Sequence, residues 1–215
     1  MTPAAVVARL EAIATDAERA KLARYGIPDD RAMGIAMRAM QALARQIGRD
    51  HALALALWRD GRYEPRTVAV YVADPQAMTA AEMDDWAGDL DSWALCDTAA
   101  FHLFDRTPHA WDAVARWTAD DRLYVRRAGL ATLWGLGSHD EVAEDSRFAD
   151  ALKALAPVAE DTRDHVQKAL SMAARSALRR GPLARTAAAA LANACASRPE
   201  TAPRRTAREI RRALA

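Results

Sequence analysis

The chain has 215 residues, of which 51% are hydrophobic and 27% charged, and its formal net charge is +1. This composition is typical of a soluble globular protein with enough chain for a sizeable core, and the charge balance alone predicts no affinity for nucleic acids. No apolar stretch approaches the roughly 18–20 residues that span a membrane. Charged residues also interrupt the N-terminal segment where a signal peptide needs an apolar run. We therefore expect a cytoplasmic, monomeric protein without membrane contact.

The charge is unevenly distributed along the chain. Residues 1–108 carry 12 basic and 16 acidic side chains, residues 109–160 carry 6 and 9, and residues 161–215 carry 12 and 4. The last segment therefore has a net charge of +8. A basic end of this kind can contact phosphates, and the alternative is a basic, solvated terminal helix.

Helical signals follow one another from the N-terminus onward. Proline and glycine separate segments of roughly 10–18 residues that are rich in the helix formers Ala, Leu, Arg and Met. Apolar residues recur three and four positions apart, as at Met33, Met37, Met40 and Leu43. Residues 67–72 form the one β-like run, and because no partner strand is evident, this run is predicted to be a buried helix.

The next signals concern where helices begin and end. Thr79 precedes Glu82 by three residues, which is the spacing of a capping box. Ser92 can cap a helix that begins at the following residue. The glycines Gly135 and Gly137 lack the rest of a phosphate-binding loop, and they are predicted to end a helix instead.

These segments together predict an all-α fold. About eleven or twelve short helices correspond to helix pairs of roughly 35–40 residues, which is the length of HEAT-type repeats. We predict an α–α superhelix of HEAT-like helix pairs that forms a single domain over residues 1–215. A non-repetitive helical bundle is the competing architecture.

The most distinctive segment spans residues 89–97. If Ser92 caps a helix, Trp93 and Asp97 lie one turn apart on the same face of that helix. An aromatic ring beside a carboxylate can form a functional site. The alternative is a half-buried tryptophan next to a solvated aspartate.

The run Asp91-Ser-Trp-Ala-Leu-Cys-Asp97 resembles the Ser-Trp-x-x-x-Asp segment of the AlkD-type DNA alkylation repair proteins, the HEAT-like-repeat alkylpurine DNA glycosylases. Further segments resemble the same family in the same order, and they are ARYGIP at 23–28, EPR at 64–66, LFDRTP at 103–108, VRRA at 125–128 and VQKAL at 166–170. The resemblance covers roughly residues 20–180.

The resemblance implies a single curved domain with a concave, basic face that binds double-stranded DNA carrying alkylated bases. It gives Trp93 the role of contacting the base and Asp97 that of promoting hydrolysis. A purine alkylated at N3 or N7 is cationic and attracts an indole face. Cleavage of its glycosidic bond develops positive charge on the sugar, which a carboxylate stabilises while it positions a water molecule. The family reads the lesion without flipping it into a pocket, and this chemistry uses no metal, cofactor or covalent intermediate.

Further DNA-binding residues are implied by the later segments. The resemblance implies a contact with the DNA backbone for Arg127, and it makes Lys168 and Arg175 DNA-binding residues. The alternative for Arg127 is a surface arginine paired with Asp120 or Asp121, and for Lys168 a solvated lysine.

Met172 occupies the position where the family has a second tryptophan. A methionine can still pack against a base, but it lacks the indole's attraction for a cation. This substitution allows a weaker glycosylase, one with a different lesion range, or a non-catalytic DNA-binding or scaffold protein.

The C-terminal segment is expected to form one basic helix. Arg204, Arg208, Arg211 and Arg212 would share a broad face that can contact DNA phosphates, and a plain surface helix is the alternative. A third alternative is a HEAT solenoid that binds other proteins. The basic C-terminal third counts against it, because binding proteins does not require this uneven distribution of charge.

The remaining cysteines, histidines and tryptophans indicate no further site. Cys96 and Cys195 do not have metal-ligand spacing, and none of the five histidines pairs with another four residues away, so we expect no metal site and no disulfide framework. The tryptophans expected in the core are Trp58, Trp86, Trp111, Trp117 and Trp134.

Overall fold

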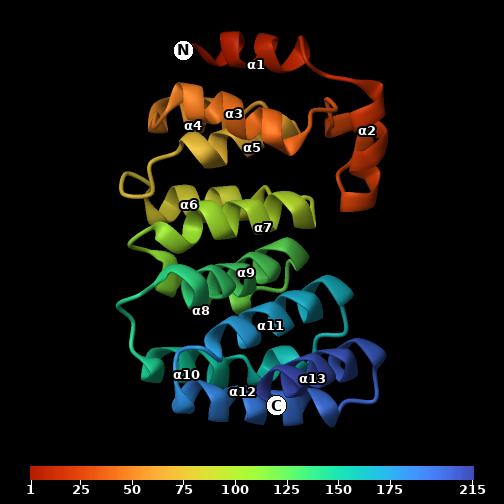
Figure 1. The fold of residues 1–215 in the computed structure, drawn as a ribbon, viewed down its shortest axis with the longest axis vertical. Coiled ribbons are helices and arrows are strands. Elements are labelled where there is room, and N and C mark those ends of the chain that lie inside the picture. The colour runs from red at the N-terminus through yellow and green to blue at the C-terminus, as the bar shows by residue number, and fades with distance from the viewer. The chain divides into compact units, whose positions relative to one another are not determined.

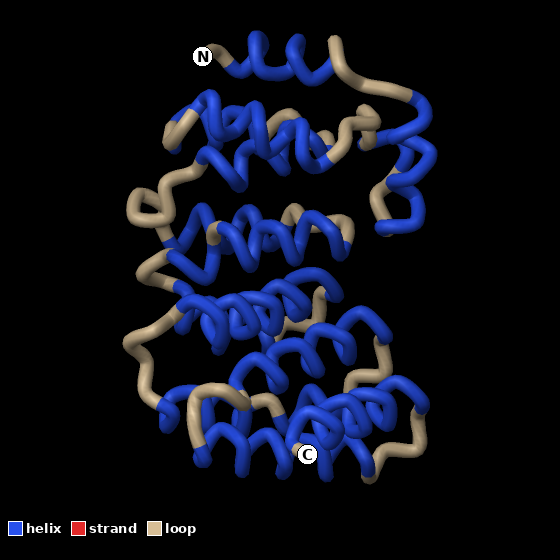
Figure 2. Tube along the Cα trace, in the orientation of Figure 1, coloured by secondary structure: helices blue, strands red, loops and turns tan.

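The protein, described here by a computed structural model of residues 1–215, consists of helices and loops without strands (Figures 1 and 2). The thirteen α-helices are α1 (Pro3–Glu11), α2 (Asp16–Leu22), α3 (Met37–Ile47), α4 (His51–Trp58), α5 (Tyr63–Val72), α6 (Ala80–Gly88), α7 (Trp93–His102), α8 (Ala110–Thr118), α9 (Leu123–His139), α10 (Asp145–Ala154), α11 (Asp164–Ala177), α12 (Pro182–Ala196) and α13 (Thr201–Leu214). Four 3-10 helices are η1 (Ala23–Tyr25), η2 (Asp29–Arg31), η3 (Phe104–Arg106) and η4 (Ala156–Glu160). The predicted all-α class is confirmed.

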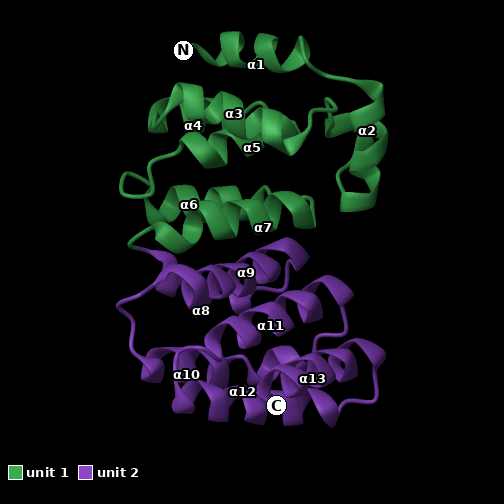
Figure 3. Ribbon diagram, in the orientation of Figure 1, with its two compact units in different colours: residues 1–108 green, residues 109–215 purple.

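Backbone contacts divide the chain into two compact units (Figure 3). Unit 1 comprises Met1–Pro108 and unit 2 comprises His109–Ala215. In a protein made of helix pairs, each pair contacts mainly the next pair along the chain. Clustering by contacts can therefore place a boundary between two pairs. The prediction of a single domain over residues 1–215 stays a prediction.

In unit 1, helix α5 packs against α1, α3, α4 and α7. The predicted buried helix at residues 67–72 is confirmed, because Val68, Val70 and Val72 have no exposed surface in α5. The capping box of α6 is also confirmed: the Thr79 side chain accepts from the backbone N–H of Glu82, and Glu82 accepts from the backbone N–H of Thr79.

Glu64 joins α5 to the chain segment before α3. Its carboxylate is fully buried and accepts backbone N–H bonds from Met33 at 2.9 Å, Gly34 at 2.7 Å and Ile35 at 3.3 Å. Hydrogen bonds from several backbone donors satisfy a buried carboxylate that would otherwise be costly. Glu64, the first residue of the family-like segment 64–66, therefore has a structural role.

Two tryptophans connect α4 and α6. The Trp58 and Trp86 rings are stacked with centroids 3.9 Å apart and planes 5° apart. Trp58 Nε1 donates to Asp89 Oδ2 at 2.9 Å, and the guanidinium of Arg66 lies over the Trp58 ring. Both indoles are 3% exposed, which confirms their predicted place in the core.

In unit 2, helix α11 lies between α9 and α13 and contacts both, while α10 packs on α12.

Helix α9 runs through Gly135 and Gly137, so the prediction that these glycines end a helix is wrong. The reason is a close approach of helices. A Cβ atom on Gly137 would lie 2.3 Å from Ser176 Oγ and 3.1 Å from the Ser176 carbonyl carbon of α11.

Candidate functional site

Ser92 sets the start of α7 and therefore the direction of its side chains. The Ser92 hydroxyl accepts from the backbone N–H of Leu95 at 3.4 Å, and α7 begins at Trp93 as predicted. The buried side of the helix carries Leu95 and Cys96, whereas Trp93 and Asp97 are half-buried. Two residues four positions apart lie about 6 Å apart along a helix axis. The structure therefore places the indole and the carboxylate on one partly open face.

The segment that contains η1 and η2 packs against Trp93 and the start of α7. The Tyr25 ring lies 5.8 Å from the Trp93 ring at an interplanar angle of 56°. Gly26 has a φ of 70°, and a Cβ atom there would lie 3.1 Å from Trp93 Cδ1. Arg31 forms a 2.9 Å ion pair with Asp91, the residue before the helix cap. The family-like segment 23–28 thus supports the aromatic ring that the sequence singled out.

Tyr25 is the aromatic residue of this site that reasoning from the sequence did not assign. Its ring is 39% exposed and lies beside Trp93, and Arg24 lies over its face at 5.4 Å. The available signal was the tyrosine before a glycine in a segment that already resembled the family. The sequence could not show that this segment meets α7, because nearly seventy residues separate them.

In unit 2, α11 brings three predicted DNA-binding residues onto one face. Lys168, Met172 and Arg175 are four and then three positions apart, a spacing that aligns side chains along a helix. Lys168 and Arg175 are exposed and Met172 is half-buried. Arg175 Nε donates to the Ser171 carbonyl at 3.3 Å, which keeps its guanidinium close to the helix surface. The result is an apolar side chain between two cations.

Helix α13 lies beside α11 and adds further arginines. Thr206 Oγ1 donates to the Gln167 carbonyl at 2.9 Å, Arg205 pairs with Asp164 at 3.1 Å, and the Ser171 hydroxyl donates to Glu209. These bonds fix the rotation of α13 about its axis.

The exposed C-terminal arginines differ in whether a protein partner holds their guanidinium groups. Arg208, Arg211 and Arg212 are exposed, but Arg211 Nη2 donates to Asn193 Oδ1 of α12 at 2.9 Å. Arg204 is also exposed, and its Nε donates to the carbonyl of Arg198 at 2.9 Å. Arg208 and Arg212 therefore remain the arginines of this group with no protein partner for their guanidinium groups.

Arg127 lies inside unit 2. It is 3% exposed, and its Nη1 donates to the carbonyl of His165. Its alternative as a surface arginine is wrong, because the side chain is buried, and Asp121 pairs with Arg126 at 2.8 Å. The DNA contact of Arg127 stays a prediction.

Asp161 orders the segment before α11. It accepts from Arg126 at 2.6 Å and from both the backbone and the side chain of Arg163. Burial acts to raise the pKa of Asp161, but the hydrogen bonds from Arg163 and Arg126 outweigh it and lower this pKa to about 2. The carboxylate is therefore a structural anion that holds two arginines.

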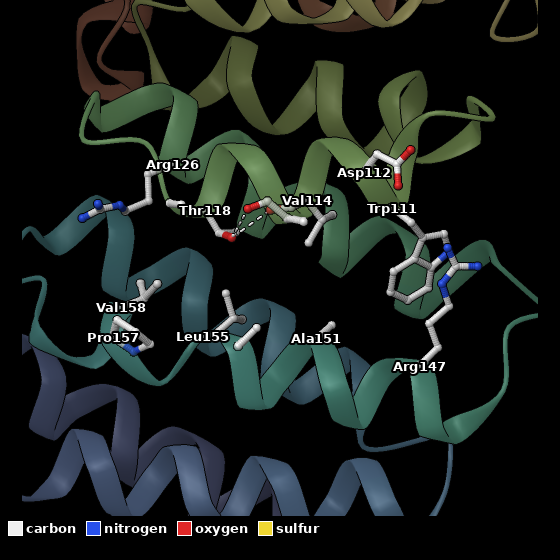
Figure 4. Close-up of a pocket in the computed structure, with 13 residues that line it drawn as sticks. Trp111, Asp112, Val114, Thr118, Arg126, Arg147, Ala151, Leu155, Pro157 and Val158 are labelled. Carbon is white, nitrogen blue, oxygen red and sulfur yellow. Dashed lines mark hydrogen bonds between the residues drawn. The ribbon is translucent and has the colours of Figure 1, made fainter.

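A cavity of about 480 Å³ lies in unit 2 between α8 on one side and α10 and η4 on the other (Figure 4). Val114 and Leu155 belong to its apolar wall. Trp111 stands at one end with the Arg147 guanidinium 4.4 Å from its ring centroid, and Arg126 stands at the other end. None of the site residues predicted from the sequence lines this cavity. Trp111 is half-buried, so it is only partly in the core.

The cysteines, possible metal-binding groups and possible membrane-spanning helices complete the description of candidate sites. Both cysteines are buried thiols outside any disulfide, and burial raises the pKa of the Cys195 thiol to about 11. No three His, Cys, Asp or Glu side chains are placed to hold a metal ion. None of the helices has the length and apolar character that crossing a membrane requires.

The charge polarity coincides with the two units. Residues 1–108 have a net charge of −4 and residues 109–215 one of +5. In unit 2 the helices α11 and α13 pack against each other and both carry exposed cations, which can attract phosphates. The predicted concave shape of a DNA-binding face stays a prediction.

Comparisons with known proteins agree with this helical arrangement. The chain is similar to the solved structure of a member of "a new family of proteins related to the HEAT-like repeat DNA glycosylases with affinity for branched DNA structures", with 22% identity, a TM-score of 0.78, and coverage of 90% of this chain and 83% of that chain. This likeness confirms the HEAT-like fold, and the competing non-repetitive bundle is wrong. A search of curated proteins gives no match. A family model described as "DNA alkylation repair enzyme" matches residues 6–210. The chain therefore belongs to the DNA alkylation repair enzyme family.

Proposed function

We propose that the protein is a DNA glycosylase that hydrolyses the N-glycosidic bond of N3- or N7-alkylated purines in duplex DNA. The observation that carries this proposal is the pair Trp93 and Asp97, one turn apart on the partly open face of α7. Tyr25 and Gly26 lie against the Trp93 ring, which supports an indole that is oriented before DNA binds. The cytoplasmic location and the monomeric state expected from the sequence remain predictions.

The chemistry follows from the charge of the lesion. An alkylated purine is cationic and already a good leaving group, so the reaction needs no acid to protonate it. The Trp93 indole attracts the cationic base, and the Asp97 carboxylate stabilises the positive charge that develops on the sugar. The same carboxylate can accept a proton from the attacking water. The glycosidic C–N bond breaks, a C–O bond forms to that water, and the neutral alkylated purine leaves.

Base release from methylated duplex DNA tests this proposal. The full chain is expected to release 7-methylguanine or 3-methyladenine, and Asp97→Asn is expected to slow release by about 10²-fold or more. Asp85→Asn is a matched control, because Asp85 is an exposed aspartate of the same unit on α6. No release above background at micromolar protein would refute the hydrolase function.

A second candidate function is the binding of DNA without hydrolysis. Met172 favours it, because this position lacks the aromatic face that the family resemblance leads us to expect. The similar solved structure is of a protein with affinity for branched DNA structures. This candidate predicts tighter binding to a four-way junction than to a linear duplex of the same length, with no base release. Equal affinity for the two DNAs would contradict it.

A further inference from the structure

Five of the eleven arginines of the acidic unit 1 form ion pairs with carboxylates. The ion pairs are Arg19–Asp29 at 2.9 Å, Arg31–Asp91 at 2.9 Å, Arg62–Asp60 at 2.7 Å, Arg66–Asp89 at 3.4 Å and Arg106–Asp105 at 3.9 Å. Arg38, Arg45 and Arg49 form no such pair, and all three lie on α3 or directly after it. They are exposed. They form a local group of arginines without carboxylate partners, whereas Arg9, Arg24 and Arg59, which also form no ion pair, lie elsewhere in the unit.

The side chains of α3 arrange this charge in a line. Arg38, Gln41 and Arg45 are three and then four positions apart, so they follow one face of the helix. The buried side of the helix carries Met40 and Leu43. We call Arg38, Gln41, Arg45, Arg49 and the neighbouring Tyr71 the α3 stripe.

A cavity of about 360 Å³ opens at one end of the α3 stripe. Gln41, Arg45, Arg49 and Tyr71 line it together with Ala44 and Gly48, and no carboxylate is among them. Every charged group in the cavity is therefore a cation.

Hydrogen bonds fix part of the cavity wall. Gln41 Nε2 donates to the Tyr71 hydroxyl at 3.0 Å, and that hydroxyl donates to Met37 Sδ at 3.8 Å. Arg49 donates to the carbonyl of Ala73, whereas Arg45 has no protein partner. One arginine is thus anchored at the cavity and the other is available to a ligand.

Helix stability does not explain the stripe. A cation near the C-terminal end of a helix, as at Arg45, interacts favourably with the helix dipole. Arg38 lies in the first turn of α3, where a cation is unfavourable, and no acidic residue in that turn compensates it. An exposed arginine at this position costs stability, which points to a ligand that carries negative charge.

The spacing of Arg38 and Arg45 fits two phosphates of one DNA strand. Arg38 and Arg45 are about 10 Å apart along the helix axis, since each residue rises 1.5 Å. Phosphates of one DNA strand follow one another about every 3.4 Å along the duplex axis. The two guanidinium groups can therefore reach phosphates about three nucleotides apart, and each can bind an oxygen pair.

We infer that the α3 stripe is a second DNA-contacting surface, which lies in the acidic unit 1 and binds phosphates of one strand. The inference rests on the proposed DNA partner but not on base hydrolysis. It extends DNA contact beyond the basic helices of unit 2. Its recognition is independent of sequence, because guanidinium groups that bind phosphate do not read the bases.

The test is the salt dependence of binding to an undamaged duplex, measured by fluorescence anisotropy with the full chain. Arg38→Gln with Arg45→Gln is expected to weaken binding and to reduce the slope of log K against log salt by about 2, since each lost phosphate contact removes roughly 0.9. Arg38→Lys with Arg45→Lys keeps the charge and is expected to retain most of the slope.

Arg59→Gln is the matched control. Arg59 is an exposed arginine of the same unit, but its cavity also contains Glu82, Asp85 and Asp89. Phosphates are repelled there, so this variant is expected to bind DNA like the parent.

An unchanged slope in the double glutamine variant, or an equal loss in Arg59→Gln, overturns the inference. Base release is measured separately at saturating protein. A chain that releases no base while the slope falls as expected refutes the hydrolase function and supports the α3 stripe. A chain that releases base while the slope is unchanged supports the hydrolase function and refutes DNA contact by the α3 stripe.

Discussion

Gly137 of α9 faces Ser176 of α11 so closely that a Cβ atom at residue 137 would lie 2.3 Å from Ser176 Oγ. The clash at Gly137→Ala is expected to cost about 3 kcal/mol, near the upper end for overpacking, because the helix backbones must move apart. Alanine gains roughly 1 kcal/mol in a helix interior, so the free energy of unfolding is expected to fall by about 2 kcal/mol. Urea unfolding measures the difference.

A double variant isolates the cause. Ser176→Gly removes the two nearest atoms, so Gly137→Ala is expected to cost less in the Ser176→Gly background than in the wild type. A Gly137→Ala protein as stable as the parent would show that α9 and α11 can separate without cost.

Asp161 is expected to make stability depend on pH at low pH. Its pKa in the folded protein is about 2, against an ordinary value of 3.8, so the stabilisation is complete above about pH 4 and is lost as the pH falls towards 2. Asp161→Asn is expected to be less stable at pH 7 and to lose less stability between pH 4 and pH 2. Asp150→Asn, which changes an exposed aspartate paired with Lys153, provides the control. Parallel stability curves for the Asp161→Asn and wild-type proteins would contradict this account.

Met172→Trp is expected to tighten binding to methylated duplex DNA. A cation–π contact stabilises by roughly 0.5–2 kcal/mol, which corresponds to about 2- to 30-fold in affinity. The half-buried position on α11 has an open side that a larger ring can use. Met172→Leu is the apolar control, and unmethylated duplex shows whether the gain belongs to the lesion. Equal binding by the Trp and Leu variants would contradict the expected cation–π contact between residue 172 and the lesion.

Arg208 and Arg212 are expected to contribute more to DNA binding than Arg211. Arg211 is held by Asn193 of α12, whereas the other two are not held by a protein partner. The double variant Arg208→Gln with Arg212→Gln is expected to reduce the salt slope by about 2. Arg211→Gln alone is expected to change the slope little. The opposite ranking would mean that DNA approaches the α12 side.

Local signals were sufficient for the helices and for the α7 pair. The Ser92 cap, the capping box of Thr79 and Glu82, and the buried run of residues 67–72 each depend on neighbours within a few positions of the chain. The same is true of Trp93 and Asp97, since helical periodicity alone aligns them.

Contacts between distant segments could not be predicted in this way. Glu64 accepts from backbone groups about thirty residues away, and Gly137 contacts Ser176 across two helices. Glycine in a helical pattern can mean an end or a close approach, and the pattern does not distinguish them. The burial of Arg127 likewise depends on the packing of α11 on α9 rather than on its own neighbours.

The stacked indoles of Trp58 and Trp86 give unit 1 an optical signature of its own. Nearly parallel indoles stacked at 3.9 Å couple their electronic transitions, and the circular dichroism that this coupling produces disappears when the rings separate. Because both rings belong to α4 and α6, this signal follows the integrity of the N-terminal half, while Trp111, Trp117 and Trp134 belong to the other half. Spectroscopy without an added label can therefore follow the unfolding of one half of the chain separately from that of the other.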